Sequence, residues 1–445
     1  LKVKNKMQLK NNYKILSFIL VFFSLSSFFL GFYLDENSAG GGSYLGDWVI
    51  AWPNLQLVLN NDILTAINHE NYYSNRTPLL YILHKIFNPF ASSEAGYRRS
   101  VFFISLAAPV LFYFCLKQKF KKEDNLLLLL VASTIFLSPY YRTTSYWGLE
   151  ENYGVICLFL SFLCLNFFLE NKNESGYITY VQLFLSIFFS SICVYFDLKL
   201  LIIPIICFLK IITSEKIIKL KVFSIFSYFL LSLPYIYLII LWGGLFAPKV
   251  GEVRNFGEQL HIDHIGYTST IIAFYFAPFL FFKRNDLFYL IKNFFIKKTN
   301  YYLILLSIIY ILYLLILSNF FDQNSLNIET SLGKGFVHKF SFILFKDNII
   351  NREIFIYFSF LISWIIILIF IDKNLKDSMI LLYFFLISIV TFPILQEYFD
   401  PLIFIMILLF FNSKIFIGYK NAIILFFYLS IFLVSSNIYY YNLLN

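Results

Sequence analysis

The stretch KILSFILVFFSLSSFFLGFYLDEN, residues 14–37, decides the fold class of this chain. Its apolar run from Ile15 to Leu34 has about the 20 residues that an α-helix needs to cross the hydrocarbon core of a bilayer. The run is longer than the apolar region of a secretory signal, and no small-x-small cleavage site follows it. We therefore expect it to be the first membrane span, ended by Asp35 and Glu36.

Similar apolar runs follow along the whole chain. Of its 445 residues 59% are hydrophobic and only 14% are charged, whereas about 25% are charged in soluble proteins. We expect an all-α, polytopic bundle in one domain, residues 1–445, with the lipid bilayer as its surroundings and about thirteen spans. The expected spans begin near residues 15, 99, 125, 152, 177, 200, 222, 266, 300, 354, 378, 401 and 422.

The charge pattern predicts how the chain is oriented. Five lysines precede the first span and place the N-terminus in the cytoplasm, and later basic tracts alternate to the same side. Because these cations lie between apolar runs rather than on a soluble surface, the net charge of +9 does not indicate a nucleic-acid partner. The many Asn, Lys, Ile, Phe and Tyr residues are typical of an AT-rich genome, so we expect a bacterial plasma membrane.

The first loop, residues 35–98, is then extracytoplasmic, and it is the longest hydrophilic stretch. Apolar residues at helical spacing in 48–67 and 78–90 predict amphipathic helices that lie in the membrane interface. The five cysteines lie inside apolar runs, where they are expected to act as small hydrophobic side chains rather than as disulfides or metal ligands.

Adjacent carboxylates stand at the end of the first span. At the boundary of a low-dielectric slab, Asp35 or Glu36 can take an unusual pKa and act as a base. The alternative is that these charges simply end the span. A glycine-rich stretch, residues 39–43, follows and allows either close backbone approach to a ligand or a plain turn. Asp47 is the next carboxylate in this loop.

Two arginines are candidate site residues. Arg76 precedes an apolar segment that starts at Pro78, and it could pair with a phosphate, with the acidic pair, or act as an interfacial charge. Arg142 lies at the junction of the third and fourth expected spans, residues 138–152. That junction also contains Trp147, Glu150 and Glu151, and aromatic faces with carboxylates are typical of sugar sites. The alternative is a structural ion pair from Arg142 to Glu150 or Glu151.

Other polar groups are weaker candidates. Asp197 and Lys199 could neutralise each other, and Glu397 lies before a late span. The sequence His261-Ile-Asp263-His264 has the residue types of a metal site, but no further ligand can be identified, so we interpret it as a polar turn and predict no metal. No nucleotide-binding, zinc-protease or serine-hydrolase motif is found.

Together these features resemble the GT-C superfamily of polyprenyl-phosphate-sugar-dependent glycosyltransferases. In that group an acidic residue, often an Asp-Glu pair, follows the first span, as Asp35-Glu36 does. A proline-led apolar segment matches 77–81, and a second acidic position after a Ser-Pro matches 138–139 with 150–151. Within the superfamily the chain resembles protein mannosyltransferases and, at 241–244 and 397–399, the dolichyl-phosphate-glucose α-1,2-glucosyltransferase. Where the latter has an arginine, this chain has Glu397.

The resemblance implies an inverting glycosyltransferase that moves a sugar from a polyprenyl phosphate to an extracytoplasmic glycolipid, polysaccharide or protein. Asp35 would be the base, Glu36 its helper or a group that orients the acceptor, and Arg76 and Arg142 would bind the donor phosphate. No cofactor, nucleotide or metal would be required. The candidate substrate-binding residues are Asp47, Arg76, Arg142, Trp147, Glu150, Glu151, His261 and Glu397.

Two other classes of protein remain open. A transporter or flippase for a lipid-linked glycan would show paired repeats and ionisable residues at mid-membrane depth. Here the charges gather at the expected external rim, and no repeat is found. An O-antigen polymerase or ligase would carry its large loop late in the chain, whereas the large loop here is early.

Overall fold

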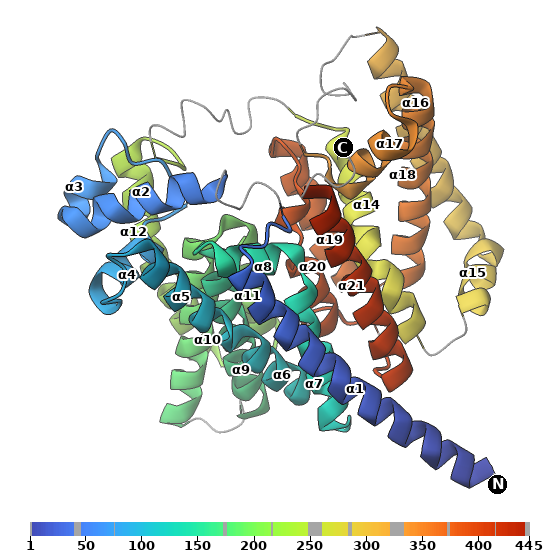
Figure 1. Ribbon diagram of the computed structural model, residues 1–445, viewed down its shortest axis with the longest axis horizontal. Helices are drawn as coiled ribbons and strands as arrows, with labels where there is room; N and C mark the ends of the chain where they lie inside the picture. The colour runs from blue at the N-terminus through green and yellow to red at the C-terminus, as the bar shows by residue number, and fades with distance from the viewer. Residues whose placement is uncertain are drawn as a thin grey trace. The chain divides into compact units, whose positions relative to one another are not determined.

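The computed structural model describes residues 2–39, 46–74, 76–171, 176–214, 217–247, 260–283, 287–320, 333–371, 374–413 and 415–440. Over these ranges the protein is helical, without a strand (Figure 1). It divides into two units. Unit 1 comprises Leu1–Asn255 and Leu429–Leu443, and unit 2 comprises Phe256–Tyr428 and Leu444–Asn445.

Unit 1 contains the first loop and the charged junction of the sequence. Within it α9 packs along α10 and against α6, and α1 packs against α7. Its elements are α1 (Lys2–Tyr33), α2 (Asp47–Asn60), α3 (Ile63–Ile67), α4 (Leu79–Phe87), α5 (Glu94–Ser105), α6 (Ala107–Lys119), α7 (Asn125–Ser133), η1 (Thr134–Leu137), α8 (Pro139–Tyr146), α9 (Glu151–Asn171), α10 (Tyr177–Phe196), η2 (Leu198–Leu201), α11 (Ile202–Ser214) and α12 (Ile218–Trp242), with the end of α21 (Tyr419–Tyr440).

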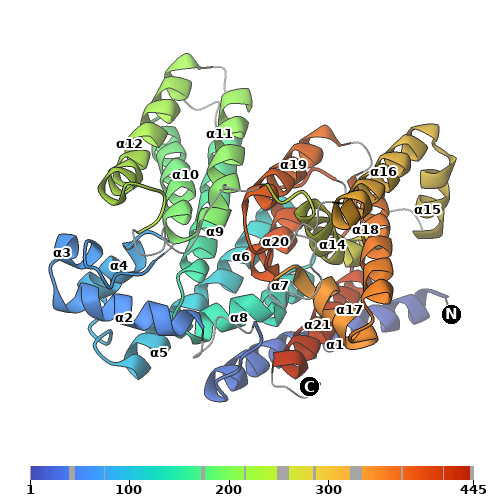
Figure 2. The ribbon, with the colours of Figure 1, turned by 90° about the horizontal axis from the view of Figure 1, so that it is seen from above.

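The first loop folds into the helices that its spacing predicts. Residues 48–67 contain most of α2 and all of α3, and α4 lies within 78–90. These three helices lie together at one end of unit 1 (Figure 2). α2 buries Trp48, Ala51, Leu55 and Val58, which recur at helical spacing on one face. Their placement in a membrane interface stays a prediction.

The chain bends sharply before α8. Ser138 caps this helix by accepting a hydrogen bond from the Tyr141 amide at 3.0 Å, and Pro139 takes the first helical position, where it is tolerated best. α8 turns 68° away from the α7–η1 segment. All eight of its side chains are buried although most are polar. The bend therefore carries hydrogen-bonding groups into the interior of unit 1.

Unit 2 is organised around α14, which packs along α18 and against α17, α19 and α20. Gly266 permits the close approach of α14 to α18, because a Cβ there would overlap the Phe360 ring. The elements of this unit are α14 (His264–Phe276), η3 (Ala277–Phe282), α15 (Leu287–Ile296), α16 (Lys298–Phe320), α17 (Gly335–Phe345), α18 (Ile349–Ile371), α19 (Leu375–Val390), η5 (Gln396–Tyr398), α20 (Leu402–Leu409) and the start of α21.

The number of helices that could cross a membrane is smaller than expected. Among the described residues, 8 helices are long and apolar enough, or up to 10 if each of two bent pairs is one span. This is the pattern of a multi-pass membrane protein. Thirteen spans are not confirmed, because α11, α19 and α20 have 13, 16 and 8 residues, short of the roughly 20 that a perpendicular span needs.

Candidate functional site

The two adjacent carboxylates after α1 have different surroundings. The Asp35 side chain is 62% exposed, whereas that of Glu36 is 10% exposed. Asp35 takes a left-handed backbone conformation with φ of 50°, and the Glu36 amide donates to the Gly31 carbonyl at 2.9 Å. The chain thus turns back at the end of the helix and separates the two side chains.

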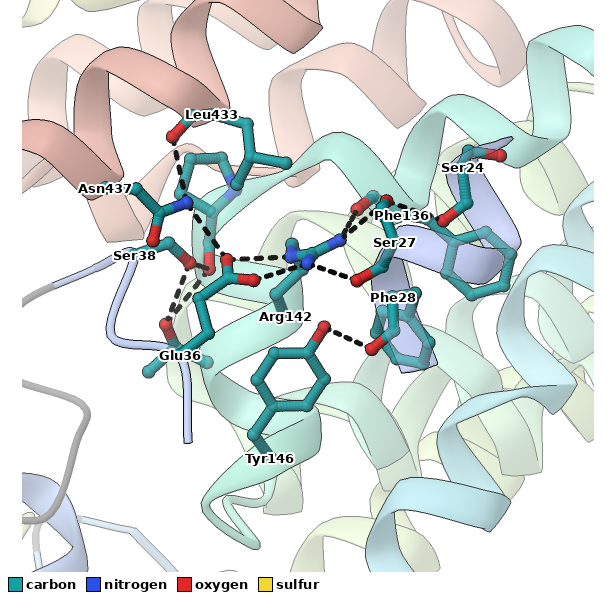
Figure 3. Close-up of polar contacts among 12 residues, drawn as sticks. Ser24, Ser27, Phe28, Glu36, Ser38, Phe136, Arg142, Tyr146, Leu433 and Asn437 are labelled. Carbon is teal, nitrogen blue, oxygen red and sulfur yellow. Dashed lines mark hydrogen bonds and ion pairs between the residues drawn. The ribbon is translucent and has the colours of Figure 1, made fainter. Parts of the chain in front are cut away.

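Glu36 is held by Arg142 of α8 (Figure 3). The Arg142 Nε donates to Glu36 Oε1 at 2.8 Å, and Nη2 donates to Oε2. The remaining three N–H groups are directed at the Ser27 hydroxyl and carbonyl and at the Phe136 carbonyl. Asn437 of α21 also donates to Glu36 Oε1, at 3.1 Å. Every donor of this guanidinium therefore has an acceptor, as a buried ion pair requires.

Gly31 makes room for this ion pair. A Cβ at Gly31 would lie 2.5 Å from the Arg142 Nη2 and 2.7 Å from the Tyr146 hydroxyl, and it would overlap the Glu36 carboxylate. Only a residue without a side chain allows the helix to pass this close.

Asp35 contacts a different arginine. The Arg98 Nη2 lies 2.5 Å from the Asp35 Oδ1, and the Arg98 Nε donates to the Tyr146 carbonyl at 2.9 Å. The guanidinium carbon lies 4.0 Å from the centre of the Trp147 ring, a cation–π contact. The Arg98 Nη1 makes no hydrogen bond to any residue that the structure describes. The Arg98 side chain is 14% exposed, and this nitrogen keeps donor capacity that the described residues do not use.

A second charged cluster surrounds Arg76. Its Nη1 lies 3.1 Å from Glu150, and its Nη2 donates to Glu151. The Tyr140 hydroxyl, from α8, also donates to Glu151, at 2.6 Å. Lys199 lies 2.8 Å from Asp197 and 4.6 Å from the centre of the Tyr140 ring. We call these residues the Arg76 cluster.

The Arg76 cluster carries an excess of negative charge. The three carboxylates of Glu150, Glu151 and Asp197 outnumber the two cations. Glu150 and Glu151 are each 3% exposed, and the Oε2 of each has no hydrogen-bond partner in the described parts of the chain. Burial raises the pKa of Glu150 to about 7, the positive charge of Arg76 opposes this rise, and Glu151 adds to it. A proton or a ligand that donates hydrogen bonds is therefore favoured here.

The ion pairs of Arg76 and Arg142 differ from those that the sequence suggested. Arg142 pairs with Glu36 rather than with Glu150 or Glu151, and those two carboxylates pair with Arg76. α8 supplies both groupings, through Arg142 and through Tyr140. Both arginines proposed as phosphate contacts are thus engaged by carboxylates.

The other candidates are found on other elements or outside the described residues. Asp47 is the first residue of α2 and is half-buried. Of the glycine-rich stretch, residues 40–43 lie outside the described residues. In unit 2, Glu397 is half-buried in η5, and the half-buried His261 ring stacks on His264, with ring centres 4.7 Å apart.

Sequence reasoning did not single out Arg98, Tyr140 or Asn437. Arg98 has a signal that could have found it, because an Arg98-Arg99 pair at the expected outer end of a span runs against the usual cytoplasmic bias of basic residues. Tyr140 is covered only as part of the 138–152 junction, and Asn437 has no comparable signal, since asparagine is abundant throughout the chain.

Comparison of the chain with family models, curated proteins and solved structures finds no match. The functional argument therefore rests on these residues.

Proposed function

We propose that this chain is a membrane-embedded, inverting glycosyltransferase that moves a sugar from a polyprenyl phosphate to an extracytoplasmic acceptor. One observation supports this above the others. At the end of the first apolar helix an exposed carboxylate, Asp35, stands 2.5 Å from an arginine that has a nitrogen without a partner in the described structure. We assign the roles of base and anion-binding group to this pair, which lies at the end of a candidate membrane span.

The chemistry requires these two groups. The acceptor hydroxyl oxygen bonds to C1 of the sugar while the bond from C1 to the phosphate oxygen breaks on the opposite face, which inverts C1. Asp35 takes the hydroxyl proton, and the polyprenyl phosphate leaves with the bonding electrons. Arg98 binds the phosphate through bidentate charge-assisted hydrogen bonds. Because that phosphate competes with Asp35 for Arg98, donor binding weakens the ion pair and frees the carboxylate.

Glu36 has a structural role in this proposal. Its two oxygens are taken by Arg142 and Asn437, so it cannot accept a proton from a substrate without breaking a buried ion pair.

The Arg76 cluster is better suited to bind sugar hydroxyls, because Glu150 and Glu151 each retain one oxygen without a partner among the described residues. The acceptor, the sugar and the linkage are left open.

A proton-coupled transporter of a lipid-linked glycan is the second candidate, and the Arg76 cluster is the observation that favours it. Buried carboxylates with a surplus negative charge, one of them with a pKa near 7, are typical of proton-coupled carriers. A transporter does not cleave the donor, so cleavage distinguishes the two.

The experiment that tests the enzyme is donor turnover. The full chain, purified in detergent, is incubated with undecaprenyl-phosphate-linked glucose or mannose and a mixture of glycolipid acceptors. Release of undecaprenyl phosphate together with a new glycolipid supports the proposal. Movement of intact donor across proteoliposomes, with no undecaprenyl phosphate released, would support the transporter instead.

A further inference from the structure

Three side chains of metal-binding type converge in one turn of unit 2, at the start of α14. His261, Asp263 and His264 each offer a ligand atom, and these atoms lie within 4.8 Å of one another. The turn is closed by the His264 amide, which donates to the His261 carbonyl at 3.1 Å, and it is tied to α19 by the His261 amide, which donates to the Ile389 carbonyl at 2.8 Å. The three groups are therefore brought together by the backbone.

Asp263 distinguishes this turn from an ordinary polar one. It is 2% exposed, and neither of its carboxylate oxygens has a hydrogen-bond partner among the described residues. Removing an ionised carboxylate from water is costly unless it is paired or coordinates a metal. The sequence alone predicted an ordinary polar turn in an external loop, and burial of both oxygens does not follow from that prediction.

His264 has one ring nitrogen against a backbone carbonyl, as many metal-bound histidines do, but its ring is stacked on that of His261, so a shared metal ion requires one of the two rings to rotate. It is 1% exposed, and its Nδ1 lies 3.0 Å from the Ser388 carbonyl. Because a carbonyl can only accept, this bond favours the tautomer with the hydrogen on Nδ1 and the lone pair on Nε2. A backbone carbonyl that fixes the tautomer in this way is common around metal-ligating histidines. The half-buried His261 would bind the ion from the side that faces solvent.

Lys334 is the cation that acts on this cluster. It is 2% exposed, and its positive charge opposes the rise in the Asp263 pKa that burial causes. Burial in turn lowers the pKa of Lys334. Electrostatic compensation by Lys334 is therefore the rival explanation for the buried carboxylate.

We propose that His261, Asp263 and His264 bind one divalent transition-metal ion of the Zn²⁺ class. Two imidazoles and one carboxylate are ligands that Zn²⁺ and its neighbours prefer, whereas Ca²⁺ and Mg²⁺ prefer oxygen ligands alone. Three protein ligands leave a fourth position for water. This site lies in unit 2 and does not depend on the proposed glycosyl transfer, so either proposal can fail without the other.

The test is metal binding by the full chain in detergent, purified with a tag that contains no histidine. After removal of metal with EDTA, the protein is titrated with Zn²⁺ and, separately, with Co²⁺. We expect one equivalent of Zn²⁺ and a visible Co²⁺ absorption band. His261→Ala is expected to weaken binding by at least about tenfold, which is the lower end of the effect of losing even a supporting contact. His69→Ala, which changes a histidine of unit 1, should leave binding unchanged.

Lys334→Met separates metal binding from charge compensation. If a metal binds, removing the neighbouring positive charge should tighten Zn²⁺ binding, and Zn²⁺ should raise the melting temperature of this variant. Asp263→Asn should lose both effects. Should the wild type and Lys334→Met bind no Zn²⁺ beyond the level of Asp263→Asn and show no Co²⁺ band, the proposal is overturned, and compensation by Lys334 explains the buried carboxylate.

Discussion

Arg142 donates hydrogen bonds to both carboxylate oxygens of Glu36, a residue 106 positions earlier in the chain. This contact joins α8 to the end of α1 and removes Glu36 from reaction with a substrate. It leaves Asp35 as the accessible member of the acidic pair.

Breaking this ion pair should destabilise unit 1. Arg142→Met leaves the Glu36 carboxylate buried without its partner, which typically costs about 3–5 kcal/mol of folding free energy. Thermal denaturation in detergent would measure the loss. Lys121→Met is the control, because the Lys121–Glu170 pair is exposed at 63% and 46% and exposed pairs contribute only about 0–1 kcal/mol. Equal melting of the two variants would contradict the structural role of Arg142.

Gly31→Ala should have a similar effect on the same ion pair. The added Cβ would meet the Glu36 carboxylate and Arg142, and overpacking of this kind costs about 1–3 kcal/mol. Gly176→Ala is the matched control, since nothing lies within 4 Å of a Cβ there. The melting temperature should fall for Gly31→Ala alone, although alanine is the better helix former, and a fall shared by both variants would show that the loss does not come from overpacking at the ion pair.

The stability of the protein should depend on pH through Glu150. Its folded pKa is about 7, above the ordinary value of 4.5, so the folded state binds this proton more tightly than the unfolded state. Stability is therefore lost as pH rises from about 4.5 through 7, because the folded state must give up a proton that the unfolded state has already released.

Glu150→Gln tests this dependence, because it removes the titrating group and keeps its shape. The drop in melting temperature from pH 5 to pH 8 should be smaller in Glu150→Gln than in the wild type. Asp263, whose pKa burial raises to about 6, adds a drop of the same sign in both proteins, so it cancels in the comparison. Identical drops in the two proteins would show that Glu150 titrates normally.

Arg98 should govern donor binding. Arg98→Gln removes the guanidinium that we assign to the donor phosphate, and we expect KM for the donor to rise by about 10–100-fold, as the loss of a charge-assisted contact of about 1.5–3 kcal/mol implies. Arg99→Gln is the control, because Arg99 is the exposed neighbour on the same helix. An unchanged KM in Arg98→Gln would move the phosphate site elsewhere.

Patterns that depend on neighbouring residues could be predicted from the sequence. The apolar run of residues 15–34 lies in α1, and the helical spacing of 48–67 and 78–90 gives α2, α3 and α4. The lengths of the later helices could not be predicted, because an apolar run does not show where a helix bends or stops. The run beginning near residue 200, for example, gives an α11 of only 13 residues.

The pairing of charges could not be predicted either. Arg76 and Arg142 both precede Glu150 and Glu151 in the chain, and sequence distance favours Arg142 as their partner. The bend before α8 instead carries Arg142 to Glu36. Arg76 pairs with Glu151, which lies 75 residues later in the chain. Such pairings follow from how the helices pack, which composition and spacing do not encode.

The central claim is that Asp35 is the base for glycosyl transfer, and Asp35→Asn tests it most directly. Release of undecaprenyl phosphate by the purified variant should fall by about 10²–10⁴-fold, the usual effect of losing a general base, with an unchanged melting temperature because this side chain is 62% exposed. Glu70→Gln, an exposed acidic residue of the same loop, should keep wild-type turnover. Near-normal turnover in Asp35→Asn, above all with loss of turnover in Asp47→Asn, would contradict the account.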